Sequence, residues 1–217
     1  MLRDATSAQD YFDARFTADP QRDALWRPVC EYLQPYIPPS GRVLDLGAGY
    51  CSFINQVQAA EKHALDLFPG VAQYAAPGVQ AHIGSCEDLS QFASHYLDAV
   101  FASNLLEHLT REALARTLAE IRRVLKPSGH LILLQPNFRY CYREYFDDYT
   151  HLQVFTHVSL ADLLTASGFT LLRVEPRCLP FSLKTRLPKS PALVRLYLKL
   201  PIRPFAKQML LIARPTR

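Results

Sequence analysis

The stretch RVLDLGAG, residues 42–49, decides the fold of this chain. Its first five residues are typical of a short buried strand. Gly47 and Gly49 then let the backbone turn tightly and approach a ligand closely, because neither carries a side chain. A glycine turn that joins a strand to a helix is the context of a nucleotide-binding loop. We therefore predict such a loop in the segment 47–60, with a helix after the glycines.

Acidic residues at two predicted strand ends indicate which nucleotide the loop binds. Asp45 would repel the pyrophosphate of a dinucleotide, whereas the ammonium and sulfonium groups of S-adenosylmethionine suit an acidic strand end. Ser52 stands where the dinucleotide motif has its third glycine, which also disfavours NAD. Asp66 ends the next predicted strand, where a carboxylate can accept hydrogen bonds from both ribose hydroxyls. The sequence therefore favours S-adenosylmethionine over NAD.

The rest of the chain alternates strand-like and helix-like segments. Apolar runs predict further strands at residues 63–67, 79–84, 97–103, 130–136, 169–176 and 207–214. Helical spacing predicts helices at residues 21–36, 110–125 and 159–167. Thr110 and Ser159 should cap the last two helices, and residues 126–129 should form a stop and turn. This alternation indicates an α/β fold, a doubly wound Rossmann-like sheet of parallel strands with helices on both faces, whose two final strands pair antiparallel.

Two further turns follow predicted strands at the edge where ligands bind in open α/β sheets. Residues 84–89 either present backbone groups and a short side chain to an adenine edge or form a turn that caps a helix. Residues 103–109 contain Glu107 and His108. We interpret Glu107 as a structural residue of the strand–helix junction. His108 either lines the opening through which the substrate enters or holds the strand–helix junction together, and both interpretations stay open.

Together these motifs resemble the class I S-adenosylmethionine-dependent methyltransferases, in particular the small-molecule branch called methyltransferase types 11 and 23. The resembling segments, in the family's order and spacing over residues 11–169, are VLDLGAG, the Asp66 end of HALDL, GSCEDL, LDAVFASNLLEHL and IRRVLKPSGHLILLQPN. The resemblance implies an S-adenosylmethionine cofactor, released as S-adenosylhomocysteine. It also implies a seven-stranded sheet in the order 3-2-1-4-5-7-6, with strand seven antiparallel.

The resemblance further implies which residues surround the cofactor. They are Asp45, Gly47, Ala48, Gly49, Asp66, Leu67, Ser85, Cys86, Glu87, Ser103 and Asn104. Tyr11 and Arg22 lie in a stretch that resembles the lid helices of relatives, and they are candidates to bind the cofactor carboxylate. Ser85 departs from the family pattern, because many relatives have an Asp there to contact the adenine amine.

The variable segment NFRYCYREYFDDYTHLQVFTH, residues 137–157, is where relatives place substrate residues. An aromatic-lined pocket with a histidine suits deprotonation of a hydroxyl near neutral pH. We predict His151 as the catalytic base and His108 as the second candidate, although a lone histidine is more often structural. The GAGYCSFIN loop resembles that of enzymes found with glycan-assembly machinery. The predicted reaction is therefore O-methylation of a small-molecule or glycan-like acceptor, lipid-linked glycans included.

Charge is distributed unevenly along the chain. No acidic residue follows Glu175, whereas ten Lys and Arg residues do. Such a segment either meets an anionic partner or forms a solvated surface facing the acidic body, and the sequence favours neither. Within it, residues 190–204 have the spacing of a short cationic amphipathic helix with Arg195 and Lys199 beside leucines. This helix would lie on an anionic membrane surface or cap the core.

Length and composition limit the possible organisation. The 217 residues suit one methyltransferase domain, with N-terminal lid helices (1–40), a cofactor-binding core (41–176) and a basic insertion (177–206) before the last strand. The sequence shows no signal core and no apolar run of membrane-spanning length. Five scattered cysteines without a CxxC pair predict reduced thiols and no metal site. We expect a cytoplasmic protein, peripheral at the inner membrane surface at most.

Two other functions compete with small-molecule methylation. An RNA methyltransferase would explain the basic tail, but the chain lacks an aromatic–basic RNA-binding appendage and an Asn-Pro-Pro-Tyr-type motif. We therefore expect no nucleic-acid partner. A non-catalytic cofactor-binding partner of another enzyme would carry the same glycine loop. The sequence leaves the acceptor, the methylated atom and the oligomeric state open.

Overall fold

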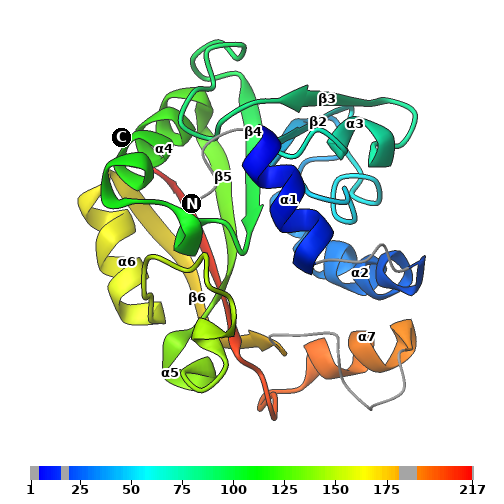
Figure 1. The fold of residues 1–217 in the computed structure, drawn as a ribbon, viewed down its shortest axis with the longest axis vertical. Helices are drawn as coiled ribbons and strands as arrows, with labels where there is room; N and C mark the ends of the chain where they lie inside the picture. Colours follow the sequence, from blue (N-terminus) through cyan, green and yellow to red (C-terminus); the bar gives the residue numbers. More distant parts are fainter. Residues whose placement is uncertain (1–4, 16–19, 181–189, 217) are drawn as a thin grey trace.

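The computed structural model describes residues 5–15, 20–180 and 190–216, and its main feature is a seven-stranded mixed sheet (Figure 1). The strands are β1 (Arg42–Leu46), β2 (Glu61–Asp66), β3 (Val79–Ile83), β4 (Leu97–Ser103), β5 (Leu125–Pro136), β6 (Phe169–Leu179) and β7 (Gln208–Pro215). Their order is β3-β2-β1-β4-β5-β7-β6, and β7 pairs antiparallel with both β5 and β6. The predicted strand order and the antiparallel seventh strand are confirmed.

Helices cover both faces of this sheet. The α-helices are α1 (Ala5–Arg15), α2 (Pro20–Leu33), α3 (Val71–Tyr74), α4 (Arg111–Val124), α5 (Phe138–Cys141), α6 (His157–Ala166) and α7 (Pro191–Lys199). The 3-10 turns are η1 (Gln34–Tyr36), η2 (Leu106–His108) and η3 (Tyr145–Asp147). Side chains of α4 and α6 pack against one face, and those of α2, α7 and the segment 51–57 pack against the other (Figure 1). The predicted doubly wound architecture is thus confirmed.

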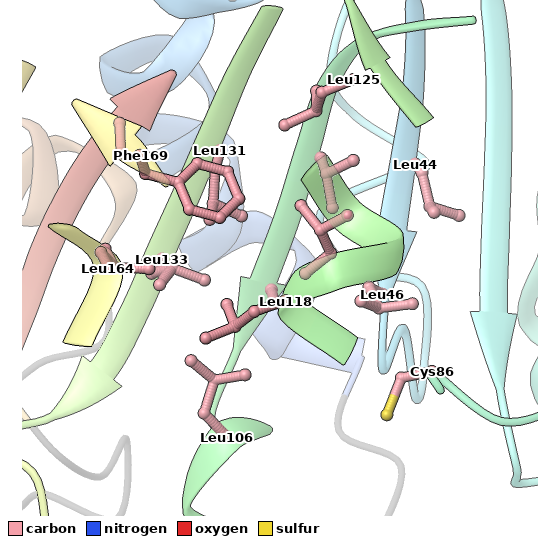
Figure 2. Close-up of a cluster of buried hydrophobic side chains, with 14 of the residues drawn as sticks. Leu44, Leu46, Cys86, Leu106, Leu118, Leu125, Leu131, Leu133, Leu164 and Phe169 are labelled. Carbon is pink, nitrogen blue, oxygen red and sulfur yellow. The ribbon is translucent and has the colours of Figure 1, made fainter. Parts of the chain in front are cut away.

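The central strands are mostly apolar on both faces because both faces of the sheet are covered. Leu44 and Leu46 of β1 lie in the same core as Leu133 of β5 and Leu118 of α4 (Figure 2). Val43, the residue before Leu44, points to the opposite face and joins the second core. This alternation explains why a buried parallel strand reads as a continuous apolar run.

Helix α4 begins where the sequence predicts. The Thr110 side chain caps it by accepting a hydrogen bond from the Ala113 N–H at 3.1 Å. The helix ends before Lys126, as predicted, but the turn predicted at residues 126–129 is wrong, because this segment is extended and belongs to β5. Leu125 pairs with Leu97 of β4 directly after the helix, so the chain enters the sheet without a separate turn.

Two other local predictions are also wrong. The segment 50–60 forms successive turns instead of a regular helix. Cys51 adopts a left-handed conformation with φ 58°, which interrupts a helix at its start. Helix α6 is capped by Thr156 and not by Ser159. Ser159 is the third helical residue and completes a capping box, because its side chain accepts from the Thr156 N–H.

The C-terminal basic segment contains the amphipathic helix, α7, which packs beside α2. The Arg195 guanidinium donates to both carboxylate oxygens of Glu31, each at 2.7 Å, and Leu198 enters the core beneath. Residues 181–189 of the predicted basic insertion lie outside the described residues. Among the helices that the structure describes, none combines the length and hydropathy that crossing a bilayer requires.

Candidate active site

The candidate site lies at the carboxyl ends of the central strands. β1 has β2 on one side and β4 on the other, and all three run parallel. In open α/β sheets, the point where the strand order reverses leaves a crevice beyond the strand ends. The loops that enter this crevice begin after Leu46, Asp66 and Ser103. They carry most of the residues that the family resemblance assigns to the cofactor.

The glycine loop is tied to the end of β2 by its backbone. Gly47 (φ 75°) and Gly49 (φ 50°) both occupy the left-handed region that favours glycine. The Gly47 N–H donates to the Leu65 carbonyl at 2.8 Å, and the Gly49 N–H donates to Asp66 Oδ2 at 2.7 Å. A Cβ added to Gly47 would lie 3.1 Å from Cδ1 of Leu105. Both glycines are therefore required by the conformation of the loop, and Gly47 also by its close neighbour.

Asp66 is half-buried at the end of β2 and holds the loops around it. Its carboxylate accepts hydrogen bonds from the Gly49 N–H at 2.7 Å and the Phe68 N–H at 2.8 Å. Burial raises the pKa of Asp66, against the lowering effect of these bonds. A carboxylate has about four acceptor sites, so further hydrogen bonds to two ribose hydroxyls are compatible with this geometry.

Asp45 lies behind the glycine loop. Its side chain is 3% exposed, and its neighbours in register are Ala64 of β2 and Phe101 of β4. Burial, and then the charge of Asp66, raise the pKa of Asp45 to about 8, against a hydrogen bond from the Ile54 backbone. Asp45 is therefore a buried carboxyl group at the end of β1, next to the glycine loop. Its contact with the cofactor stays a prediction.

In the turn after β3, two side chains contact α4. The Thr117 hydroxyl donates to the Cys86 thiol at 3.4 Å, and Glu87 forms an ion pair with Arg116. Ser85 Oγ accepts the Glu87 N–H at 3.2 Å within the turn. These contacts support the structural interpretation of Cys86 and Glu87. An adenine contact by this turn, still a prediction, would fall mainly to its backbone.

The residues after β4 are held by the neighbouring strands. Asn104 (φ 49°) donates its backbone N–H to the Leu134 carbonyl at 3.0 Å. Its side-chain oxygen accepts from Gln208 at 2.8 Å. Ser103 and Asn104 thus lie at the carboxyl end of β4, and Gln208 of β7 orients the Asn104 side chain.

Tyr11 and Arg22, the N-terminal candidates, lie beside different parts of the site. The guanidinium carbon of Arg22 is 6.0 Å from the centre of the Tyr50 ring, next to the glycine loop. The Tyr11 ring lies edge-on to His108, with ring centres 6.0 Å apart, and its hydroxyl donates to Asp148 at 2.8 Å. Arg22 is therefore placed near the cofactor loop, and Tyr11 near the predicted catalytic residues.

The two predicted catalytic histidines, far apart in sequence, lie together in the fold. His108 ends η2 after β4, and His151 follows η3 after β5. Their ring centres are 4.8 Å apart. One ring nitrogen from each histidine and a carboxylate oxygen of Glu107 all lie within 4.8 Å of one another.

Hydrogen bonds assign the proton on each histidine ring when that ring is neutral. Nδ1 of His151 lies 2.6 Å from the Tyr145 carbonyl oxygen, which only accepts, so this nitrogen donates. The Thr150 hydroxyl donates to Asp148 at 2.6 Å, so its oxygen accepts from Nδ1 of His108 at 2.8 Å. Nε2 is consequently the basic nitrogen of both rings.

Asp148 holds the Thr150 hydroxyl, which in turn bonds to His108. It is 5% exposed and accepts hydrogen bonds from the hydroxyls of Thr150 and Tyr11. Burial raises the pKa of Asp148, but these hydrogen bonds and the charge of His108 outweigh burial and hold the pKa below its usual range. A carboxylate that stays ionised keeps Thr150 as its donor, and so keeps Nδ1 of His108 protonated.

Glu107 is the unusual member of the group. Its side chain is 0% exposed, and neither carboxylate oxygen has a hydrogen-bond partner among the described residues. Burial, and then the charge of Asp148, raise the pKa of Glu107 to about 8. Its backbone carbonyl accepts from the N–H groups of Leu152 and Gln153, at 2.7 and 3.0 Å, and so joins η2 to the segment after His151.

The sequence did not predict that Glu107, Asp148 and Thr150 lie around His108 and His151. A usable signal was present, because Glu107-His108 and Asp148–His151 follow the predicted neighbouring strands β4 and β5. Polar residues after adjacent parallel strands meet at one sheet edge. Which side chains bond to which histidine depends on the conformation of the loops, and the sequence does not give that conformation.

The residues around the glycine loop fit S-adenosylmethionine. The N–H groups of Gly47, Ala48 and Gly49 are all bonded within the protein, to Leu65 and Asp66. A pyrophosphate would need such N–H groups free, whereas S-adenosylmethionine carries no phosphate. Asp66 keeps acceptor sites for a ribose at the same place.

Comparison with known proteins agrees with this geometry. A family model described as a methyltransferase domain matches residues 44–133. The chain is 33% identical over 177 residues to the malonyl-[acyl-carrier protein] O-methyltransferase of Methylococcus capsulatus. That match covers 72% of this chain and 63% of the relative, so the chain spans less than two thirds of the relative's length.

Solved methyltransferases share the fold over most of the chain. A SAM-dependent methyltransferase of Archaeoglobus fulgidus superimposes with a TM-score of 0.67 and 21% identity, covering 94% of this chain and 97% of that one. The 1,6-didemethyltoxoflavin-N1-methyltransferase of Burkholderia thailandensis, solved with S-adenosylhomocysteine, superimposes with a TM-score of 0.61 and 21% identity. The match covers 96% of this chain and 84% of that one. The family model, the strand order and the glycine loop together show a methyltransferase domain of the class I fold in this chain, and they support S-adenosylmethionine as its cofactor.

Proposed function

We propose that this chain transfers the methyl group of S-adenosylmethionine to an oxygen of a small-molecule or glycan-like acceptor. The observation that carries the proposal is the position of the histidine pair relative to the glycine loop. Leu105, which lies against Gly47, directly precedes η2, and η2 ends at His108. His108 therefore follows, after one short turn, the residue that lies against the glycine loop, and the His151 ring centre is 4.8 Å from that of His108.

The chemistry needs little more from the chain than alignment and proton removal. When bound, S-adenosylmethionine supplies a methyl group on a sulfonium, which is already activated toward a nucleophile. The chain must hold the acceptor oxygen in line and favour loss of its proton. Two histidines whose Nδ1 protons are held by Tyr145 and Thr150 present fixed basic edges for that purpose.

The relatives leave the methylated atom open. The Methylococcus protein is named as an O-methyltransferase and the Burkholderia protein as an N1-methyltransferase. We favour oxygen because a hydroxyl has to lose a proton during transfer, and a histidine pair serves that step. Incubation with methyl-labelled S-adenosylmethionine and separate lipid, glycan and small-molecule fractions should label one of these classes. No labelled product from any fraction, despite cofactor binding, would support the non-catalytic alternative.

Replacing Asp66 by alanine should weaken S-adenosylhomocysteine binding by about 2–3 kcal/mol, because charge-assisted hydrogen bonds to the ribose are lost. Calorimetry on the folded variant measures the effect. Asp162→Ala is the matched control, since Asp162 is an exposed carboxylate on α6, outside the cofactor loops. Unchanged affinity in a folded Asp66→Ala protein would remove this residue from the cofactor site.

A second function, peripheral contact with an anionic membrane, is favoured by the surface of α7 and the residues after it. Leu196, Ile202 and Phe205 are 60%, 76% and 80% exposed. Charge supports the contact less, because Arg195 and Arg203 form ion pairs with Glu31 and Glu175. The proposal therefore depends mainly on the exposed apolar side chains, which would bury themselves at a lipid interface.

Co-sedimentation with vesicles tests this contact. Binding to anionic vesicles should exceed binding to neutral ones and should fall at high salt, since each basic residue near an anionic surface contributes about 1 kcal/mol. Changing Leu196 and Ile202 to serine should reduce binding, and so should changing Arg195 and Lys199 to glutamate. Equal recovery in the supernatant under all conditions would leave α7 with only the role of covering the core beside α2.

A further inference from the structure

Glu107, His108 and His151 bring three potential metal-ligand atoms together, and a role in general acid–base catalysis explains only one of them. A general base needs one histidine, yet two imidazoles and a carboxylate converge here within 4.8 Å. Two histidines and one carboxylate are a common ligand set for divalent first-row metal ions. We infer that these three side chains bind such an ion and that the acceptor reaches it through two neighbouring oxygen atoms. This inference rests on the proposed function and specifies how the histidine pair would serve it.

The orientation of both imidazoles suits ligation. A metal-binding histidine usually donates its other ring N–H to a carbonyl or to a carboxylate-linked group. His151 does so through Nδ1 to the Tyr145 carbonyl, at 2.6 Å. His108 does so through Nδ1 to Thr150, which in turn donates to Asp148. Both rings therefore direct Nε2, the nitrogen with the lone pair, away from these bonds.

Glu107 is the independent observation that points to a ligand. A buried carboxylate is normally paired or hydrogen-bonded. Glu107 is fully buried, and both of its oxygens have no hydrogen-bond partner within the described ranges. The sequence predicts a structural role for Glu107 at the strand–helix junction, but among the described residues its side chain bonds to no other residue that would hold the junction together. A cation bonded to one carboxylate oxygen would supply the missing partner.

The spacing requires only a small adjustment. Ligands bonded to one ion at about 2.0–2.2 Å lie about 3–4 Å from one another. The donor atoms here lie within 4.8 Å, so rotations of these side chains can bring them to an ion. The Nδ1 hydrogen bonds hold both histidine rings, so rotation of the Glu107 side chain makes most of this adjustment.

Three protein ligands leave coordination positions open. An acceptor with two adjacent oxygens, such as a vicinal diol or a catechol, would fill two of them. Binding to the ion lowers the pKa of the reacting hydroxyl, whose proton passes to solvent. The acceptor oxygen then forms a bond to the methyl carbon while the sulfur–methyl bond breaks. The products are a methyl ether, S-adenosylhomocysteine and one proton.

Metal titration of the full chain, without a histidine tag, tests the site directly. After treatment with a chelator, the wild type should bind one equivalent of Zn²⁺ by calorimetry. Co²⁺ should give the visible absorption of a nitrogen–oxygen site. Glu107→Gln and His151→Ala should each weaken Zn²⁺ binding at least 10-fold. The matched controls Glu144→Gln and His157→Ala should bind as the wild type does, because Glu144 pairs with Lys207 and His157 contacts Asn137.

The acceptor class is tested with catechol and phenol as probes. Catechol should shift the absorption of the Co²⁺-loaded protein, whereas phenol, which has a single oxygen, should not. Equal shifts from both would overturn the chelating acceptor. Lack of a stoichiometric Zn²⁺ site, or equal affinity in the wild type and Glu107→Gln, would overturn the metal site.

S-Adenosylhomocysteine binding separates this inference from the proposed function. If methyl transfer continues unchanged after removal of metal, the metal site is refuted and the proposed methyltransferase function is retained. Failure to bind S-adenosylhomocysteine in any metal state would sink the proposed function itself. Loss of methyl transfer on chelation, with recovery on adding Mn²⁺ or Zn²⁺, would support both.

Discussion

Replacing Gly47 by valine should abolish binding of S-adenosylhomocysteine. Gly47 has φ 75°, a conformation that a β-branched residue adopts only with strain of about 1–3 kcal/mol. Its added Cβ would also approach Leu105 to 3.1 Å, at the point where β1 turns into the cofactor loop. Together these effects should displace the loop. Calorimetry should then show no heat of binding at concentrations that saturate the wild type.

Gly78→Val separates strain from the loss of the binding loop. Gly78 has a positive φ of 89°, but a Cβ there would have no atom within 4 Å. This variant should lose some stability and keep its affinity for S-adenosylhomocysteine. A folded Gly47→Val protein that binds as well as the wild type would show that the loop does not contact the cofactor. Binding of NAD without a response to S-adenosylhomocysteine would refute the cofactor assignment.

Replacing His151 by alanine should lower turnover about 100-fold or more, while the affinity for S-adenosylhomocysteine stays unchanged. His151 lies beside His108 and Glu107, and its Nδ1 proton is held by the Tyr145 carbonyl. Its loss removes a basic Nε2 from the acceptor side and leaves the glycine loop untouched. Turnover is measured with the acceptor fraction that the labelling assay identifies.

His157→Ala is the control for this effect. His157 begins α6 and contacts the Asn137 side chain, outside the histidine pair, so turnover should be retained. A fully active His151→Ala protein would direct attention to His108, the second candidate, or to an acceptor that needs no base. A parallel loss of cofactor affinity would indicate that the variant had disturbed the fold, which a thermal melt would detect.

The sequence predicted the sheet more accurately than the turns. β1 and β4 have the bounds expected from RVLDL and LDAVFAS, because a strand covered on both faces carries apolar residues at consecutive positions, as in Val43-Leu44 and Ala99–Ala102. The helix expected after Gly49 was wrong, since one left-handed residue, Cys51, breaks it. Such a backbone conformation depends on packing around the loop, and the composition of the segment gives no sign of it.

The candidate site also has one part that the sequence predicts and another part that only the fold reveals. Gly47, Gly49 and Asp66 could be assigned from sequence, because their roles follow from local backbone geometry and from the position of a strand end. His108 and His151 could be nominated separately, as titratable groups in two loops. That their rings lie together, each with its Nδ1 proton assigned by a bonded oxygen, follows only from the fold.

The sequence alone predicted the α/β fold and the cofactor, since apolar periodicity and a glycine turn act over a few neighbouring residues, and the family followed from resemblance. The tertiary structure decided which side chains lie together around the two histidines. Glu107 looks like an ordinary junction residue in sequence, and only the assembled loops after β4 and β5 bury it beside two imidazoles without a hydrogen-bond partner in the described part of the chain. Burial and pairing are properties of three-dimensional neighbours, which come from distant parts of the chain.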